Sequence, residues 1–183
     1  MDVRLICHIL RREMGTPLAF FITWRCYGTW LHGEEGSFDR EHNTYGEPPR
    51  PTAEKLARFE RAEMKHPPMA LTADQRPLVA TTIVETVLAR GWTLLAINVR
   101  TNHVHVVVAA EGRPEPVMRT LKSWCTRRLR ECGAVDLDRP VWSREGSTVY
   151  LWDEEEIAQA CWYVTDGQDA PRGSRHRSVD RGD

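Results

Sequence analysis

The sequence predicts an α+β fold, in which helices lie on one face of an antiparallel sheet, within a single domain. Runs rich in aromatic and β-branched residues alternate with stretches in which apolar residues recur every three or four positions. The length of 183 residues suits one domain better than two, and a hydrophobic share of 41% is enough for a packed core.

The first predicted strand is followed by a long insertion. Residues 18–24 are a run of aromatic and branched residues that is typical of a strand. Residues 25–70 are polar and rich in glycine and proline, and an insertion of this length is usually functional or mobile. Within it, residues 52–64 have the pattern of a short helix, for which Thr52 can serve as N-cap.

A helix and two closely connected strands come next. The helix is expected over residues 73–90, with Thr72 as its N-cap and Gly91 directly after its end. The strands are expected over residues 93–100 and 103–110. Only two residues separate them, so the connection is tight.

The last part of the chain contains two further helices around a β-type region. A helix is expected over residues 116–132, and residues 141–151 are interpreted as strand, loop and strand around 144–147. Asp153 can cap a final helix that runs to about Thr165. The order strand, insertion, helix, strand, strand, helix, strand, helix fits a ferredoxin-like sandwich.

Domain boundaries follow from composition. Residues 1–16 are expected to be an N-terminal extension, residues 17–170 the domain, and residues 171–183 a disordered basic tail. No run approaches the roughly 18 apolar residues of a membrane helix, and no signal-peptide pattern is present. We therefore expect a cytoplasmic protein without a membrane partner. The five cysteines lack the spacing of a zinc site or a disulfide framework.

The strongest functional signal is a pair of histidines within the second of the closely connected strands. Side chains alternate between the faces of a strand, so His103 and His105 project from the same face. Two imidazoles side by side can hold one divalent ion. Because histidines at i and i+2 also occur by chance, a third ligand and a nucleophile have to come from elsewhere.

The final helix offers both. Tyr163 is followed by Asp166 and Gln168, which places a phenol and oxygen ligands in one neighbourhood. A phenol can attack phosphorus once a metal polarises the phosphate. Taken by itself, a tyrosine at this place in a helix more often packs at the edge of a core than acts as a nucleophile.

Together these features resemble the single-tyrosine HUH transposases, which include the insertion-sequence-200-type and REP-associated tyrosine transposases. The signature His-hydrophobic-His at His103–His105, followed by a helix with one tyrosine, carries the likeness, which extends over roughly residues 17–169. The resemblance implies that the two histidines bind Mg²⁺ or Mn²⁺. It also implies that Tyr163 attacks a DNA phosphate, giving a 5′-phosphotyrosine and a free 3′-OH.

The third ligand departs from the family's pattern. The family usually has Gln or Asn four residues after the tyrosine, where this chain has Gly167. Gln168 is therefore the expected third ligand and Asp166 the alternative. Asn102, just before the histidines, is assigned a place in the turn or behind the metal ligands.

The overall net charge of −1 does not indicate a nucleic-acid binder, but basic residues crowd one predicted helix. Lys122, Arg127 and Arg130 lie largely away from its apolar face, where a solvated surface is the plain interpretation. Together with Arg144, the resemblance makes them candidates for contact with DNA phosphates.

The expected function is that of a transposase-like endonuclease and strand transferase. Its expected substrate is single-stranded or hairpin DNA, in DNA transposition or in the processing of hairpin repeats, in a bacterial cytoplasm at the nucleoid. A homodimer is compatible with the resemblance. The alternative is a domesticated or catalytically inactive DNA-binding module.

Overall fold

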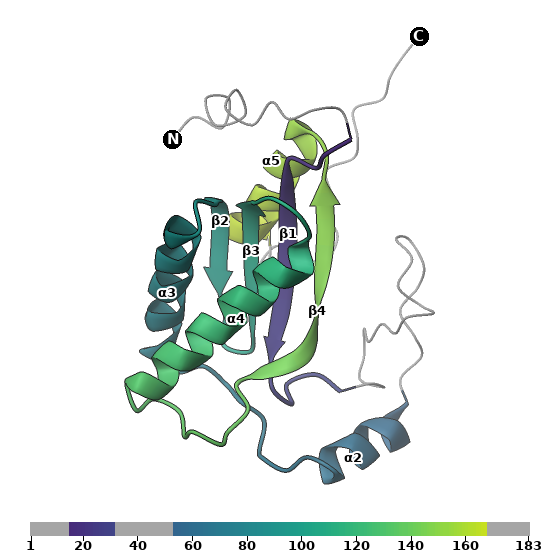
Figure 1. The fold of residues 1–183 in the computed structure, drawn as a ribbon. Coiled ribbons are helices and arrows are strands. Elements are labelled where there is room, and N and C mark those ends of the chain that lie inside the picture. Colours follow the sequence, from purple (N-terminus) through teal and green to yellow (C-terminus); the bar gives the residue numbers. More distant parts are fainter. Residues whose placement is uncertain (1–14, 32–52, 168–183) are drawn as a thin grey trace.

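The computed structural model describes residues 15–31 and 53–167, in which a single four-stranded antiparallel sheet is covered by helices (Figure 1). The strands are β1 Ala19–Cys26, β2 Thr93–Val99, β3 His103–Ala109 and β4 Trp142–Leu151, in the spatial order β2-β3-β1-β4. The helices are α2 Glu54–Ala62, α3 Gln75–Ala89, α4 Pro114–Glu131 and α5 Glu154–Trp162, and α5 continues into a π-helical turn, η1 Tyr163–Gly167. The predicted α+β class is confirmed.

Helices α3 and α4 cover one face of the sheet, as predicted (Figure 1). Alternate residues of β1 and β3, among them Ile22, Trp24 and Val106, are fully buried beneath them. Helix α3 begins at Gln75, directly after Asp74 and two residues later than predicted. The hydrogen bonds expected of Thr72 are present, since the Gln75 backbone N–H donates to Thr72 Oγ1 and the Thr72 N–H donates to Gln75 Oε1.

The last helix differs from the prediction, because α5 and η1 pack on the opposite face (Figure 1). Its buried residues Ile157 and Val164 join Val107 and Ala109 of β3 in a second, smaller core. The physical reason is that β3 is apolar on both faces along its second half. A sheet surface of that kind has to be covered on both sides.

Strand β4 is continuous, so the interpretation of residues 141–151 as strand, loop and strand was wrong. The polar residues around Gly146 pair with β1, and a bulge opposite Trp24–Cys26 absorbs the irregularity. A Cβ on Gly146 would lie 2.6 Å from the Thr23 carbonyl oxygen and 2.4 Å from Met118 Sδ. The glycine that suggested a loop instead permits close packing of β4.

Some predictions fall outside the described residues. These are the N-terminal extension up to residue 14, residues 32–52 of the insertion with its cap Thr52, and the chain from Gln168 onward with the basic tail. The short helix predicted within the insertion is present as α2. Among the helices in the described part of the chain, none is long and apolar enough to cross a membrane.

Candidate active site

The two histidines lie side by side on the sheet face that α5 and η1 partly cover. Their ring centroids are 4.6 Å apart with the ring planes at 80°. Val104, Val106 and Val108 point the other way, into the core beneath α3 and α4. The alternation expected from the sequence is therefore observed.

Each histidine is held through its Nδ1 atom. Thr23 Oγ1 lies 2.7 Å from His105 Nδ1, an interaction that joins residues 82 positions apart. Asn102 Oδ1 accepts a hydrogen bond of 2.7 Å from His103 Nδ1. A histidine whose Nδ1 is engaged in this way presents Nε2 to a metal ion, and such partners fix the tautomer and the ring orientation of metal ligands.

His105 is kept in the neutral form. Burial lowers the pKa of His105 to about 3, and the positive charges of His103, Arg25 and Arg100 act in the same direction. Only 6% of the residue is exposed. The neutral imidazole is the form that can donate a lone pair to a cation, so His105 is ready to act as a ligand near pH 7.

Tyr163 completes a cluster of four rings. Its ring centroid lies 5.8 Å from that of His105 and 5.9 Å from that of Phe21, both in edge-to-face geometry. Phe21 in turn stacks on His105 at 5.6 Å. Tyr163 remains 43% exposed, so a substrate can reach it while its ring is held against His105 and Phe21.

The segment that carries Tyr163 is anchored from both sides. Val164 is fully buried in the smaller core, and its carbonyl oxygen accepts a 2.7 Å hydrogen bond from Asn98 Nδ2. Asn98 lies on β2 directly opposite His105. Sequence reasoning did not identify Asn98 or Thr23. The signal that could have drawn attention to Asn98 is an amide within an otherwise apolar strand segment, Leu94–Val99.

Only one of the two oxygen ligands expected after Tyr163 lies among the described residues. Asp166 is exposed and accepts a hydrogen bond from the Thr165 hydroxyl, whereas Gln168 lies outside the described residues. Within residues 15–31 and 53–167, no three His, Cys, Asp or Glu side chains are grouped closely enough to hold an ion. The described donor set for a metal is thus the two imidazoles, and the third ligand stays a prediction.

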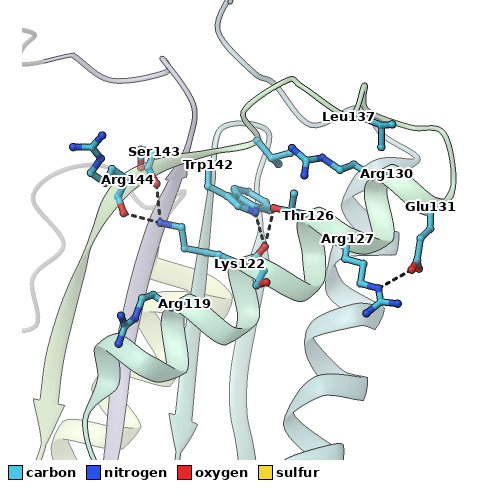
Figure 2. A pocket seen from close by; sticks show the side chains of 12 residues that line it. Arg119, Lys122, Thr126, Arg127, Arg130, Glu131, Leu137, Trp142, Ser143 and Arg144 are labelled. Carbon is cyan, nitrogen blue, oxygen red and sulfur yellow. Dashed lines mark hydrogen bonds and ion pairs between the residues drawn. The ribbon is translucent and has the colours of Figure 1, made fainter.

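The residues predicted to bind DNA gather in one open groove of about 770 Å³ between α4 and the start of β4 (Figure 2). Because α4 packs on the face away from the histidines, the groove lies on the other side of the sheet from Tyr163. The groove is lined by Arg119, Lys122, Arg127, Arg130, Arg144 and Trp142, among others.

These cations differ in how far they are available to a ligand. Lys122 is half-buried, donates from Nζ to the carbonyls of Ser143 and Arg144 at 2.7 and 3.1 Å, and has a pKa lowered by burial. It therefore connects α4 to β4, a role that the sequence did not indicate, and its contact with DNA phosphates stays a prediction. In Figure 2, the Arg119 and Arg144 side chains extend outward, and both residues are exposed.

The other two arginines of the groove have partners within the chain. Arg127 forms an ion pair of 2.8 Å with Glu131, and both side chains are more than half exposed. Arg130 Nη2 donates to the Arg139 carbonyl at 3.3 Å. An exposed pair of this kind contributes little to stability, so Arg127 can exchange Glu131 for a stronger anion.

Comparison with known proteins gives distant similarities of fold. No protein-family model matches the sequence, and no curated protein is similar to it. A solved structure of a putative transposase from Deinococcus radiodurans is 13% identical, with a TM-score of 0.43, over 88% of this chain and 99% of that one. A REP-associated tyrosine transposase bound to a REP hairpin is 12% identical, with a TM-score of 0.47, over 84% of this chain and 68% of that one.

Proposed function

We propose that this chain is a transposase-like enzyme that nicks and rejoins single-stranded DNA through a covalent link to Tyr163. The observation that carries the proposal is the placement of a half-exposed tyrosine ring beside two neighbouring, individually oriented histidines on one face of the sheet. A nucleophile, a pair of metal-binding nitrogens and an accessible surface are the parts that phosphoryl transfer to tyrosine requires.

The reaction exchanges one phosphodiester bond for another. Tyr163 Oη attacks a DNA phosphorus atom and forms a phosphotyrosine bond to the 5′ side, while the bond from phosphorus to the 3′ oxygen breaks. The phenol loses its proton and the departing 3′ oxygen gains one, so the products are a 5′-phosphotyrosine and a 3′-OH. Because a phenol is a good leaving group, attack by a 3′-OH can reverse the step without external energy.

The histidine pair fits a divalent ion of the Mg²⁺ or Mn²⁺ kind. Its imidazoles are on one face, His105 is neutral, and the Nδ1 atoms are engaged by Thr23 and Asn102. When bound, the ion would supply Lewis-acid polarisation of the phosphate. Paired imidazoles tolerate Mn²⁺ well, and Gln168 or Asp166 is the proposed oxygen ligand.

The surroundings of the histidines also favour an anionic substrate. Arg25 lies opposite His103 in the strand register, and the Arg100 backbone N–H donates to the His103 carbonyl. The charges of both arginines contribute to the low pKa of His105. The positive field that keeps His105 neutral thus acts attractively on a phosphate near the same rings.

The direct test is covalent capture. Wild-type protein is incubated with Mn²⁺ and single-stranded DNA from the flanks of its gene, labelled at the 3′ end. We expect an SDS-resistant protein–DNA adduct that EDTA prevents. DNA binding without any adduct on either flanking strand would instead support the alternative, a catalytically inactive DNA-binding module.

The groove leads to a separate prediction about DNA affinity. Changing Arg119 and Arg144 together to Gln should weaken binding to all single-stranded sequences. It should also lower the slope of log K against log salt by about 1.4, since each phosphate contact contributes about 0.7 for single strands. The measurement is a fluorescence-anisotropy titration at several salt concentrations.

Arg128→Gln is the matched control for that titration. Arg128 is on the same helix but does not line the groove, and it pairs with Glu85 at 2.7 Å. Its loss should leave the slope unchanged. If the double variant also keeps the wild-type slope, the groove does not contact phosphates.

A further inference from the structure

The tyrosine segment and the histidine strand are joined through a single side chain. Asn98 is the register partner of His105 between β2 and β3. Paired residues of antiparallel strands point to the same face of the sheet, so the Asn98 amide lies on the histidine side. From there its Nδ2 donates to the Val164 carbonyl at 2.7 Å, one residue beyond Tyr163.

This hydrogen bond holds the backbone of the turn that carries the tyrosine. Val164 is the second of the five residues of η1, so the amide fixes the turn directly after Tyr163. π-Helical turns are rare and are often found at functional sites, where their geometry needs support from the surroundings.

The three anchors of the segment act on different atoms. The Val164 side chain is buried in the smaller core, Asn98 holds the Val164 carbonyl, and Phe21 packs against the Tyr163 ring at 5.9 Å. Burial of an apolar side chain is compatible with several rotations of the turn about its helix axis. A hydrogen bond of defined direction is compatible with only one of them. The amide therefore restricts where the phenol can lie relative to His105.

We propose that Asn98 is a positioning residue that holds the Tyr163 phenol at the histidine pair, so that it sets the rate of DNA cleavage without contributing to DNA affinity. This inference rests on the proposed function for its kinetic part only. The groove with the basic residues is on the other side of the sheet, so loss of the amide should not alter it. A misplacement of about 1 Å in a reacting group can cost about 100-fold in rate.

Two variants test the role of the amide. Asn98→Leu keeps the approximate volume and removes the donor, and Asn98→Ala removes both. With the labelled single strand, we expect kcat for nicking to fall by about 100-fold in each, while KM and the anisotropy-measured DNA affinity stay near wild type. Gln75→Ala is the control, because it removes a side-chain hydrogen bond of 2.8 Å to the Ala134 carbonyl, and the acceptor of the Thr72 N–H, away from the site.

A spectroscopic measurement tests the positioning without DNA or metal. Tyrosines are replaced by 3-fluorotyrosine, and the ¹⁹F resonance of Tyr163 is identified by its absence in Tyr163→Phe. In the wild type, the nearby His105 and Phe21 rings shift this resonance. In both Asn98 variants, we expect it to move toward the solvent-exposed value, whereas Gln75→Ala leaves it in place.

The two measurements separate the possible failures. If the resonance does not move in Asn98→Leu, or if an active wild type and Asn98→Leu cleave at equal rates, the positioning role is overturned. If the resonance moves but the wild type forms no adduct on any strand, the positioning stands and the proposed enzymatic function fails.

Discussion

Tyr163→Phe should abolish both the covalent DNA adduct and all nicking, while the protein stays folded and binds DNA as before. The change removes only the hydroxyl. The ring keeps its edge-to-face contacts with Phe21 and His105. At a position that is 43% exposed, we expect the free energy of unfolding to change by less than about 0.5 kcal/mol.

The measurement combines SDS gels for the adduct with product analysis for nicking and chemical denaturation for stability. Tyr150→Phe is the matched control. Tyr150 packs edge-to-face on Phe20 and stacks on Trp152, on the other face of the sheet from the histidines. We expect this variant to form the adduct at the wild-type rate.

Two results would contradict the assignment in different ways. An adduct formed by Tyr163→Phe would mean that another tyrosine is the nucleophile, Tyr27 and Tyr45 being the remaining ones beside Tyr150. Nicking without any adduct would mean that water is the nucleophile. The chain would then be a hydrolase, and the transposase interpretation would be wrong.

His105→Ala should lower metal-dependent cleavage by about 1,000-fold or more, because a Lewis acid at the phosphate is worth several kcal/mol of transition-state stabilisation. With one of two neighbouring imidazoles gone, Mn²⁺ affinity measured by calorimetry should fall as well. DNA affinity should be nearly unchanged, since the groove is on the far side of the sheet. His103→Ala should behave in the same way.

Stability distinguishes a chemical effect from misfolding in this variant. His105 is buried, so truncation to Ala also leaves a small cavity and removes the hydrogen bond to Thr23. His105→Leu fills more of that space without offering a ligand atom and serves as a second variant. Full cleavage by either folded variant would remove the metal hypothesis, whatever its effect on the melting temperature.

Local periodicity decided much of what the sequence predicted correctly. His103 and His105 share a face because strand alternation depends on the backbone of one strand alone. The caps of two helices were equally local: Asp153 accepts from the Glu156 N–H and Thr72 from the Gln75 N–H, each within three residues. Both features follow from spacing along the chain.

Contacts across the sheet could not be obtained from spacing. Thr23 reaches His105 because β1 and β3 are neighbours in a specific register, and Asn98 reaches Val164 because η1 crosses β2. The sequence of a strand indicates which of its faces is buried, but it does not indicate which strand lies beside it or in which register. The burial of Lys122 between α4 and β4 has the same origin.

The sequence by itself therefore determined the α+β class, the order of the elements and the pairing of the two histidines on one face. Only the tertiary structure brought Tyr163 to them. That meeting depends on α5 crossing to the second apolar face of β3, which gives η1 a surface on which Val164 is buried. The apolar run of β3 is visible in the sequence, but which helix covers its second face is decided only when the strands pair and the sheet is assembled.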